Sequence, residues 1–264
     1  MRWTTGVCEA NGIGIHYLRT GSEKPPVVLL HGLIGSGACW TPVARGLEGE
    51  YDVVMPDARG HGSSAAPAQG YRYDDHARDV VGVVQGMGLA APILLGHSMG
   101  GMTAAVVASR AAKTIRGLVL VDPTFLSPAY QREVFESDVA EQHRRALGLT
   151  KSDLVAQGQA RHPRRSPELL ELMAEARLRT SPNAFEVLSP PNPDYRQLVS
   201  AIEVPSLLVI GDKGNVVSLE TATELRRLNP RLRVEQIRDA GHGLPYDQPE
   251  RLAATVRSFL RSLA

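Results

Sequence analysis

Cysteine is scarce in this sequence, and the two that occur, Cys8 and Cys39, are far apart. Their separation matches neither the close cysteine pairs of zinc sites nor the framework of a disulfide-rich domain. We therefore expect two buried or incidental thiols. The histidines, cysteines and carboxylates also form no group with metal-ligand spacing, so no metal site is predicted.

Long apolar runs and a strong charge imbalance are missing as well. No stretch approaches the roughly 18 apolar residues that a membrane-spanning helix needs, and the first six residues lack the apolar core of a secretory signal. The formal net charge is +1, which argues against a general attraction to nucleic acid or an anionic membrane. We expect a cytoplasmic monomer or homodimer that acts on a small molecule, without nucleic-acid or membrane partners.

Short apolar runs alternate with amphipathic stretches along most of the 264 residues, a length that suits one large α/β domain. The alternation predicts a mostly parallel sheet with helices on both faces. The expected strands are residues 13–19, 27–30, 52–55, 92–95, 117–121, 205–210 and 232–237. The expected helices are residues 74–87, 98–111, 219–228 and 249–263.

This alternation stops between about Thr124 and Ser189. No strand-like run occurs there, and the segment is rich in Arg, Glu and Leu and interrupted by prolines. We expect three or four short helices inserted after one strand, with the chain rejoining the sheet at Pro205.

The five residues from Gly96 to Gly100 read Gly-His-Ser-Met-Gly, which is the G-x-S-x-G pattern of a nucleophile elbow. A predicted strand precedes the pattern and a helix of small residues follows it, as the sharp turn requires. The N-terminus of that helix directs free N–H groups and the positive end of its dipole at the site. We therefore predict Ser98 as a nucleophile.

An oxyanion hole and a base complete this chemistry. A glycine-rich turn from His31 to Gly35 follows a buried strand and can face the elbow, so we expect the backbone N–H groups of Leu33 and Met99 to bind the oxyanion. His242 lies in a loop between the last strand and the last helix, which fits the chain order nucleophile, acid, base. Among the other histidines, His31, His61 and His97 are expected to shape loops, and the expected surface histidines are His16, His76, His143 and His162.

Together, His31-Gly32, the turn at residues 57–63, the elbow at residues 96–101 and Gly241-His242 resemble the α/β-hydrolase superfamily over nearly the whole chain. The likeness is nearest to capped esterases, enol-lactonases and cofactor-free perhydrolases. It implies an eight-stranded, mostly parallel sheet with helices on both faces and a helical cap. The implied domains are a core at residues 1–123 and 190–264 and a cap subdomain at residues 124–189.

The acid of the triad departs from this resemblance. Most members carry it after the seventh strand in a Gly-x-x-Asp loop, but that position is occupied here by Gly214, which has no side chain. Asp212 lies nearby. Asp122 ends the strand that follows the elbow helix, a layout that resembles some haloalkane dehalogenases and lactonases. We favour Asp122 and keep Asp212 as the alternative.

The predicted function is that of a carboxylic ester hydrolase, an esterase or lactonase, acting through an acyl-enzyme and needing no metal or organic cofactor. A serine at the elbow excludes a hydrolytic dehalogenase, which requires a carboxylate there. Expected substrates are hydrophobic esters or lactones such as N-acyl homoserine lactones. Candidates for an apolar acyl pocket are Phe125, Tyr130, Phe135, Met173 and Phe185.

Three other functions remain open on the same scaffold. Perhydrolysis without a cofactor and hydrolysis of a carbon–carbon bond use much the same residues. Some relatives bind a small ligand without turning it over, so a non-catalytic receptor is the alternative of a different class. An intact Ser98 and His242 argue against the receptor.

Overall fold

The central feature is one eight-stranded sheet with the strand order β1-β2-β4-β3-β5-β6-β7-β8. The computed structural model describes residues 3–21, 23–214 and 216–263. β1 and β2 form an antiparallel hairpin, β2 pairs antiparallel with β4, and every later pairing is parallel. The strands are β1 Thr4–Ala10, β2 Ile13–Arg19, β3 Pro26–Leu30, β4 Asp52–Pro56, β5 Ile93–His97, β6 Gly117–Val121, β7 Ser206–Gly211 and β8 Leu232–Ile237. The prediction of a mostly parallel sheet is therefore confirmed.

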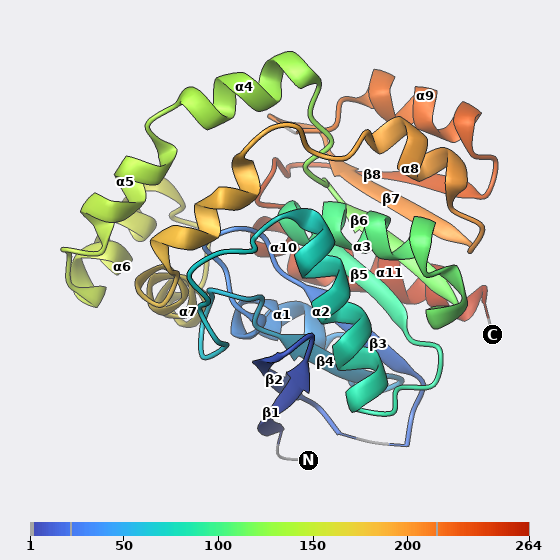
Figure 1. Ribbon diagram of the computed structural model, residues 1–264, viewed down its shortest axis with the longest axis horizontal. Helices are drawn as coiled ribbons and strands as arrows, with labels where there is room; N and C mark the ends of the chain where they lie inside the picture. Colours follow the sequence, from blue (N-terminus) through green and yellow to red (C-terminus); the bar gives the residue numbers. More distant parts are fainter. Residues whose placement is uncertain (1–2, 22, 215, 264) are drawn as a thin grey trace.

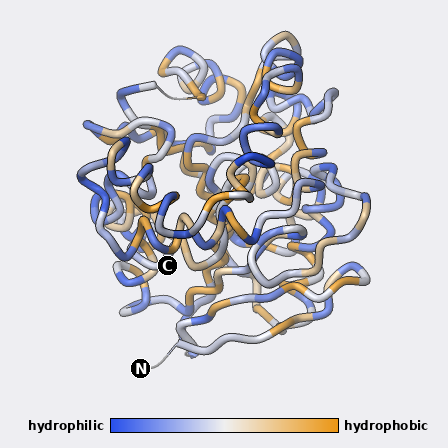
Figure 2. Tube along the Cα trace, turned by 90° about the vertical axis from the view of Figure 1, so that its left-hand side faces the viewer, coloured by the Kyte–Doolittle hydropathy of each residue, from blue (hydrophilic) through white to orange (hydrophobic). Residues whose placement is uncertain are grey.

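Both faces of the sheet are covered, and this explains the continuous apolar runs of the central strands. Along β3, Val28 and Leu30 pack into the core on one face, whereas Val27 and Leu29 pack into the core on the other. One face carries α2 Tyr73–Gly86, α3 Met99–Arg110, α8 Tyr195–Ala201 and α9 Leu219–Leu228; the other carries α1 Thr41–Arg45, α10 Leu244–Asp247 and α11 Pro249–Arg261. Hydrophobic stretches accordingly gather inside the fold and hydrophilic ones along its outer turns (Figure 2).

The segment between β6 and α8 is helical throughout and forms an arch on one side of the molecule (Figure 1). It contains four α-helices and one 3-10 helix, where the sequence predicted three or four short helices. They are α4 Pro128–Glu136, α5 Val139–Ala146, α6 Lys151–Arg161, α7 Pro167–Leu178 and η3 Pro182–Leu188. We call α4 through η3 the insertion; its status as a cap subdomain remains a proposal. No helix in the described part of the chain is long and apolar enough to cross a bilayer.

Two histidines expected at the surface are buried, and that expectation was wrong. His76 is 3% exposed on the sheet-facing side of α2, and His143 is fully buried on α5, where its ring stacks on Phe185. Helical spacing places both on the packed face of their helices, which a reading of polarity alone does not capture. Burial, with Arg59 and His31 nearby, lowers the pKa of His76 to about 3.

The buried His76 predicts a loss of stability in mild acid. The unfolded chain takes up this proton near pH 6.5, whereas the folded protein resists until about pH 3, so unfolding binds a proton between these values. The free energy of unfolding therefore falls as the pH is lowered through this window. In urea titrations, His76→Gln should lose about 2 kcal/mol less than the wild type between pH 6.5 and 5. Equal losses in the two proteins would contradict the prediction.

Candidate active site

Ser98 lies on a strained turn between β5 and α3. Its backbone has φ 53° and ψ −118°, outside the regions that side chains usually adopt. A side chain at Gly96 would collide with the backbone of Gly100, and one at Gly100 would collide with the carbonyl of Leu30. The two glycines of the motif are therefore required by close backbone approach, and the turn projects Ser98 from the carboxyl edge of the sheet.

A continuous chain of hydrogen bonds joins Ser98, His242 and Asp122. The Oγ of Ser98 lies 3.0 Å from Nε2 of His242, and Nδ1 of His242 lies 2.6 Å from Oδ2 of Asp122. A carboxylate only accepts, so Nδ1 carries the proton and Nε2 is free to accept the serine proton. All three residues follow the carboxyl ends of strands β5, β6 and β8, which is why they converge from distant parts of the chain.

Asp122 is held in place by the loop after β7, the loop that was expected to carry the acid. Asp122 is fully buried, and its two oxygens accept the backbone N–H groups of Val216 at 3.0 Å and Val217 at 2.8 Å. Asp212 is exposed, and its carboxylate accepts the N–H of Ala240 at 3.3 Å. Of the two candidates, the structure brings Asp122 to His242.

His97 holds in place the loop that carries His242. Its Nε2–H donates to the carbonyl of His242 at 2.7 Å, and the two rings lie 4.9 Å apart. Burial, together with the neighbouring His242, lowers the pKa of His97 to about 3. The ring is therefore neutral at physiological pH and places no competing charge beside His242.

The two residues expected to form the oxyanion hole flank the serine. Met99 is the first residue of α3, so its N–H has no acceptor within the helix. Leu33 lies in the loop after β3 and lines the same cavity as Ser98. In this loop Gly32 approaches the Ser98 side chain closely, and Ile34 has a positive φ of 59°. The loop therefore runs directly beside the elbow, as the expected oxyanion hole requires.

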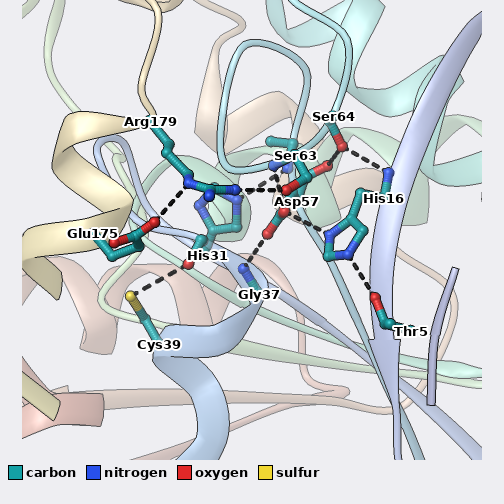
Figure 3. Close-up of polar contacts among 12 residues, drawn as sticks. Thr5, His16, His31, Gly37, Cys39, Asp57, Ser63, Ser64, Glu175 and Arg179 are labelled. Carbon is teal, nitrogen blue, oxygen red and sulfur yellow. Dashed lines mark hydrogen bonds and ion pairs between the residues drawn. The ribbon is translucent and has the colours of Figure 1, made fainter. Parts of the chain in front are cut away.

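The carboxylate of Asp57 anchors that loop to the rest of the fold (Figure 3). Its oxygens accept the N–H of Gly37 at 2.7 Å and of Ser63 at 2.9 Å, and contact Nδ1 of His16 at 2.8 Å. Burial raises the pKa of Asp57, but the hydrogen bonds from His16 and the backbone outweigh it and leave the pKa below its ordinary value. Arg179, just past α7, donates to the hydroxyl of Ser63 and so ties the insertion to this turn.

A cavity of about 360 Å³ opens in front of Ser98, between the sheet edge and helices α6 and α7. Its floor comes from the residues of the elbow, the loop after β3 and the His242 loop. Its basic wall comes from Arg161, His162, Arg165 and Arg177, and no Asp or Glu is among the described residues that line it.

The predicted apolar lining is largely wrong. Of its five members only Met173 lines the cavity. Phe125 is buried against Tyr195 and Phe185 against His143, while Tyr130 and Phe135 are exposed. The direction in which a helix turns its apolar side chains depends on what the helix packs against, and the sequence does not contain this information.

Sequence reasoning also missed residues that the structure brings to the site. The backbone N–H groups of Val216 and Val217, which donate to Asp122, cannot be recognised from the type of side chain. Two arginines of the cavity wall did have a signal, because Arg161 and Arg165 stand close together with Arg164 in a proline-containing stretch. Within the described residues, no group of three or more His, Cys, Asp or Glu side chains is placed to hold a metal ion.

Comparison with known proteins gives matches over most of the chain. A family model described as alpha/beta hydrolase fold matches residues 25–249. The chain is 32% identical to N-formylmaleamate deformylase from Pseudomonas putida, over 97% of this chain and 96% of that protein. It is 24% identical to 2-(acetamidomethylene)succinate hydrolase from Mesorhizobium japonicum, over 92% and 90% of the two chains. Among solved structures, an esterase from Rhodococcus superposes with a TM-score of 0.78 at 26% identity, over the whole of both chains.

Proposed function

Because the chain belongs to the α/β-hydrolase family, we propose that it is a serine hydrolase that cleaves small carboxylic amides or esters through an acyl-enzyme on Ser98. The observation that carries the proposal is the hydrogen-bonded chain from Ser98 through His242 to the buried Asp122. A serine hydroxyl is a weak nucleophile at neutral pH, and this arrangement supplies the base that activates it.

In the proposed reaction, His242 takes the proton of Ser98 as Oγ attacks the substrate carbonyl. The carboxylate of Asp122 keeps Nδ1 protonated and stabilises the imidazolium that forms. The N–H groups of Leu33 and Met99 bind the oxyanion, and loss of one such donor typically costs on the order of 100- to 1,000-fold in rate. His242 then gives its proton to the leaving nitrogen or oxygen. Water, activated by the same histidine, releases the acid and restores Ser98.

The names of the relatives bear on whether the cleaved bond is an amide or an ester. Two of the relatives are named for a deformylation and for hydrolysis of an acetamido compound, which favours a carbon–nitrogen bond. The similarity to an esterase favours the ester or lactone predicted from the sequence. Both reactions pass through the same tetrahedral intermediate and need the same residues, so the proposal covers both.

Covalent phosphorylation by an activated phosphate triester tests this function directly. Diethyl 4-nitrophenyl phosphate should modify the protein once, release one equivalent of 4-nitrophenol and abolish turnover of 4-nitrophenyl acetate. Mass spectrometry of peptides should place the added group on Ser98, because His242 activates that hydroxyl alone. An unlabelled protein that turns over neither this ester nor 4-nitroformanilide, yet binds a small ligand tightly, would instead support the receptor.

A further inference from the structure

The wall of the cavity formed by α6 and α7 carries two arginines without an acidic partner among the described residues. Arg161 ends α6 and Arg177 lies near the end of α7, and both line the cavity that contains Ser98. Among the described residues, Arg161 donates to the neutral side chain of Gln157 at 3.3 Å, and the buried Nε of Arg177 has no hydrogen-bond partner. Neither takes part in an ion pair within the described parts of the chain.

The third arginine of the cavity differs from this pair. Arg165 is buried, bonds the carboxylate of Asp247 at 2.9 Å and lies over the ring of Tyr246, so its charge is already balanced. It belongs to the packing of the segment that follows His242. The unbalanced positive charge of the cavity therefore comes from Arg161 and Arg177.

Placing these two guanidinium groups at one cavity costs free energy. Burial, together with the charge of Arg161, lowers the pKa of Arg177 below its ordinary value. A buried N–H without an acceptor is also unfavourable. An anion bound at the two groups would balance their charge, because a guanidinium presents paired N–H donors that match a carboxylate.

We propose that Arg161 and Arg177 form a binding site for a carboxylate group of the substrate. The ligand class is a small mono- or dicarboxylate whose other end reaches Ser98 with the bond to be cleaved. The proposal rests on the proposed function for the reaction at Ser98, but the binding of the anion itself does not need the reaction. It replaces the hydrophobic acyl chain expected from the sequence with a short, charged substrate.

Binding of succinate to the full-length Ser98→Ala protein tests the site without turnover. We expect titration calorimetry to give a dissociation constant for succinate at least tenfold lower than for succinamide, its neutral counterpart. Arg161→Gln or Arg177→Gln should raise the succinate constant by about 10- to 100-fold, the range of a lost charge-assisted hydrogen bond. Arg144→Gln is the matched control, because Arg144 is an exposed arginine of α5 outside the cavity, paired with Glu141; it should leave the constant within about threefold.

Catalysis gives a second, separate readout. With Ser98 intact, kcat/KM for mono-(4-nitrophenyl) succinate should exceed that for 4-nitrophenyl butyrate. The two arginine variants should lower kcat/KM for the succinate ester more than for the butyrate and so remove this preference, whereas Arg144→Gln should keep it. Arg161 is exposed at the end of α6, so its variant keeps the test valid even if Arg177→Gln disturbs folding. Equal binding of succinate and succinamide, or unchanged succinate binding in Arg161→Gln, would overturn the carboxylate site. Tight, arginine-dependent succinate binding in a protein that hydrolyses no ester or amide would instead overturn the proposed function and leave the site standing.

Discussion

Replacing Asp122 with asparagine is expected to lower kcat by about four orders of magnitude, the loss typical of such a change in a serine triad. The neutral amide cannot stabilise the imidazolium as a carboxylate does. Its NH₂ group can also donate to Nδ1, which would move the imidazole proton to Nε2 and leave no acceptor for the hydroxyl of Ser98. The measurement is steady-state hydrolysis of 4-nitrophenyl acetate by purified variant and wild type.

Asp212→Asn is the matched control for this prediction. Asp212 is exposed and contacts a backbone N–H of its own neighbourhood, so kcat should stay within about threefold of wild type. Because the oxygens of Asp122 also hold Val216 and Val217, circular dichroism and thermal melting must establish that Asp122→Asn is folded. The opposite result would identify Asp212 as the acid of the triad. In that case Asp122→Asn would be folded and nearly fully active, whereas Asp212→Asn would lose most of its activity.

Ser98→Ala should abolish acyl transfer, with a loss in kcat on the order of a million-fold. The change removes the atom on which the proposed acyl-enzyme forms, while the proposed oxyanion donors and the cavity stay in place. Residual turnover therefore measures what positioning and the oxyanion hole contribute without a nucleophile. Rapid mixing with 4-nitrophenyl acetate should also lose any burst of 4-nitrophenol.

Two further variants sharpen this result. His242→Ala combined with Ser98→Ala should be scarcely slower than either single change, because residues that act as a unit give non-additive effects. Ser109→Ala removes a hydroxyl from the same helix, where it bonds the carbonyl of Val106, and should leave kcat unchanged within about threefold. Turnover that survives in Ser98→Ala at the wild-type rate would exclude Ser98 as the nucleophile.

The residues of the proposed site come from both the core and the insertion. The sheet supplies Ser98, Asp122 and His242 from the ends of its strands, where rigid backbone holds their geometry. The insertion supplies Arg161 and Arg177 from a pair of packed helices. Under the proposed function the core performs the chemistry and the insertion selects the substrate, so we expect substitutions on α6 and α7 to change specificity before they change the reaction.

The sequence by itself indicated the repeating architecture and two of the three residues of the proposed triad. Strand runs such as Val27 to Leu30 are short and bounded by proline and glycine, and the elbow motif around Ser98 is contiguous, so both can be read locally. His242 followed from chain order. The strand runs and the elbow depend on neighbouring residues alone, and the corresponding strands and turn form where they were expected.

Only the tertiary structure decided the geometry between distant segments. Asp122 and Asp212 both follow strands at the same sheet edge, and the choice between them depended on how the loop after β7 packs its N–H groups around Asp122. Polarity suggested a surface position for His76, but the packing of α2 buries it. Phe125 was expected to line the cavity, but it lies in the loop after β6 and stacks on Tyr195. The convergence of Arg161 and Arg177 likewise depends on two helices packing side by side, an arrangement set by contacts across the whole fold and not by any local pattern.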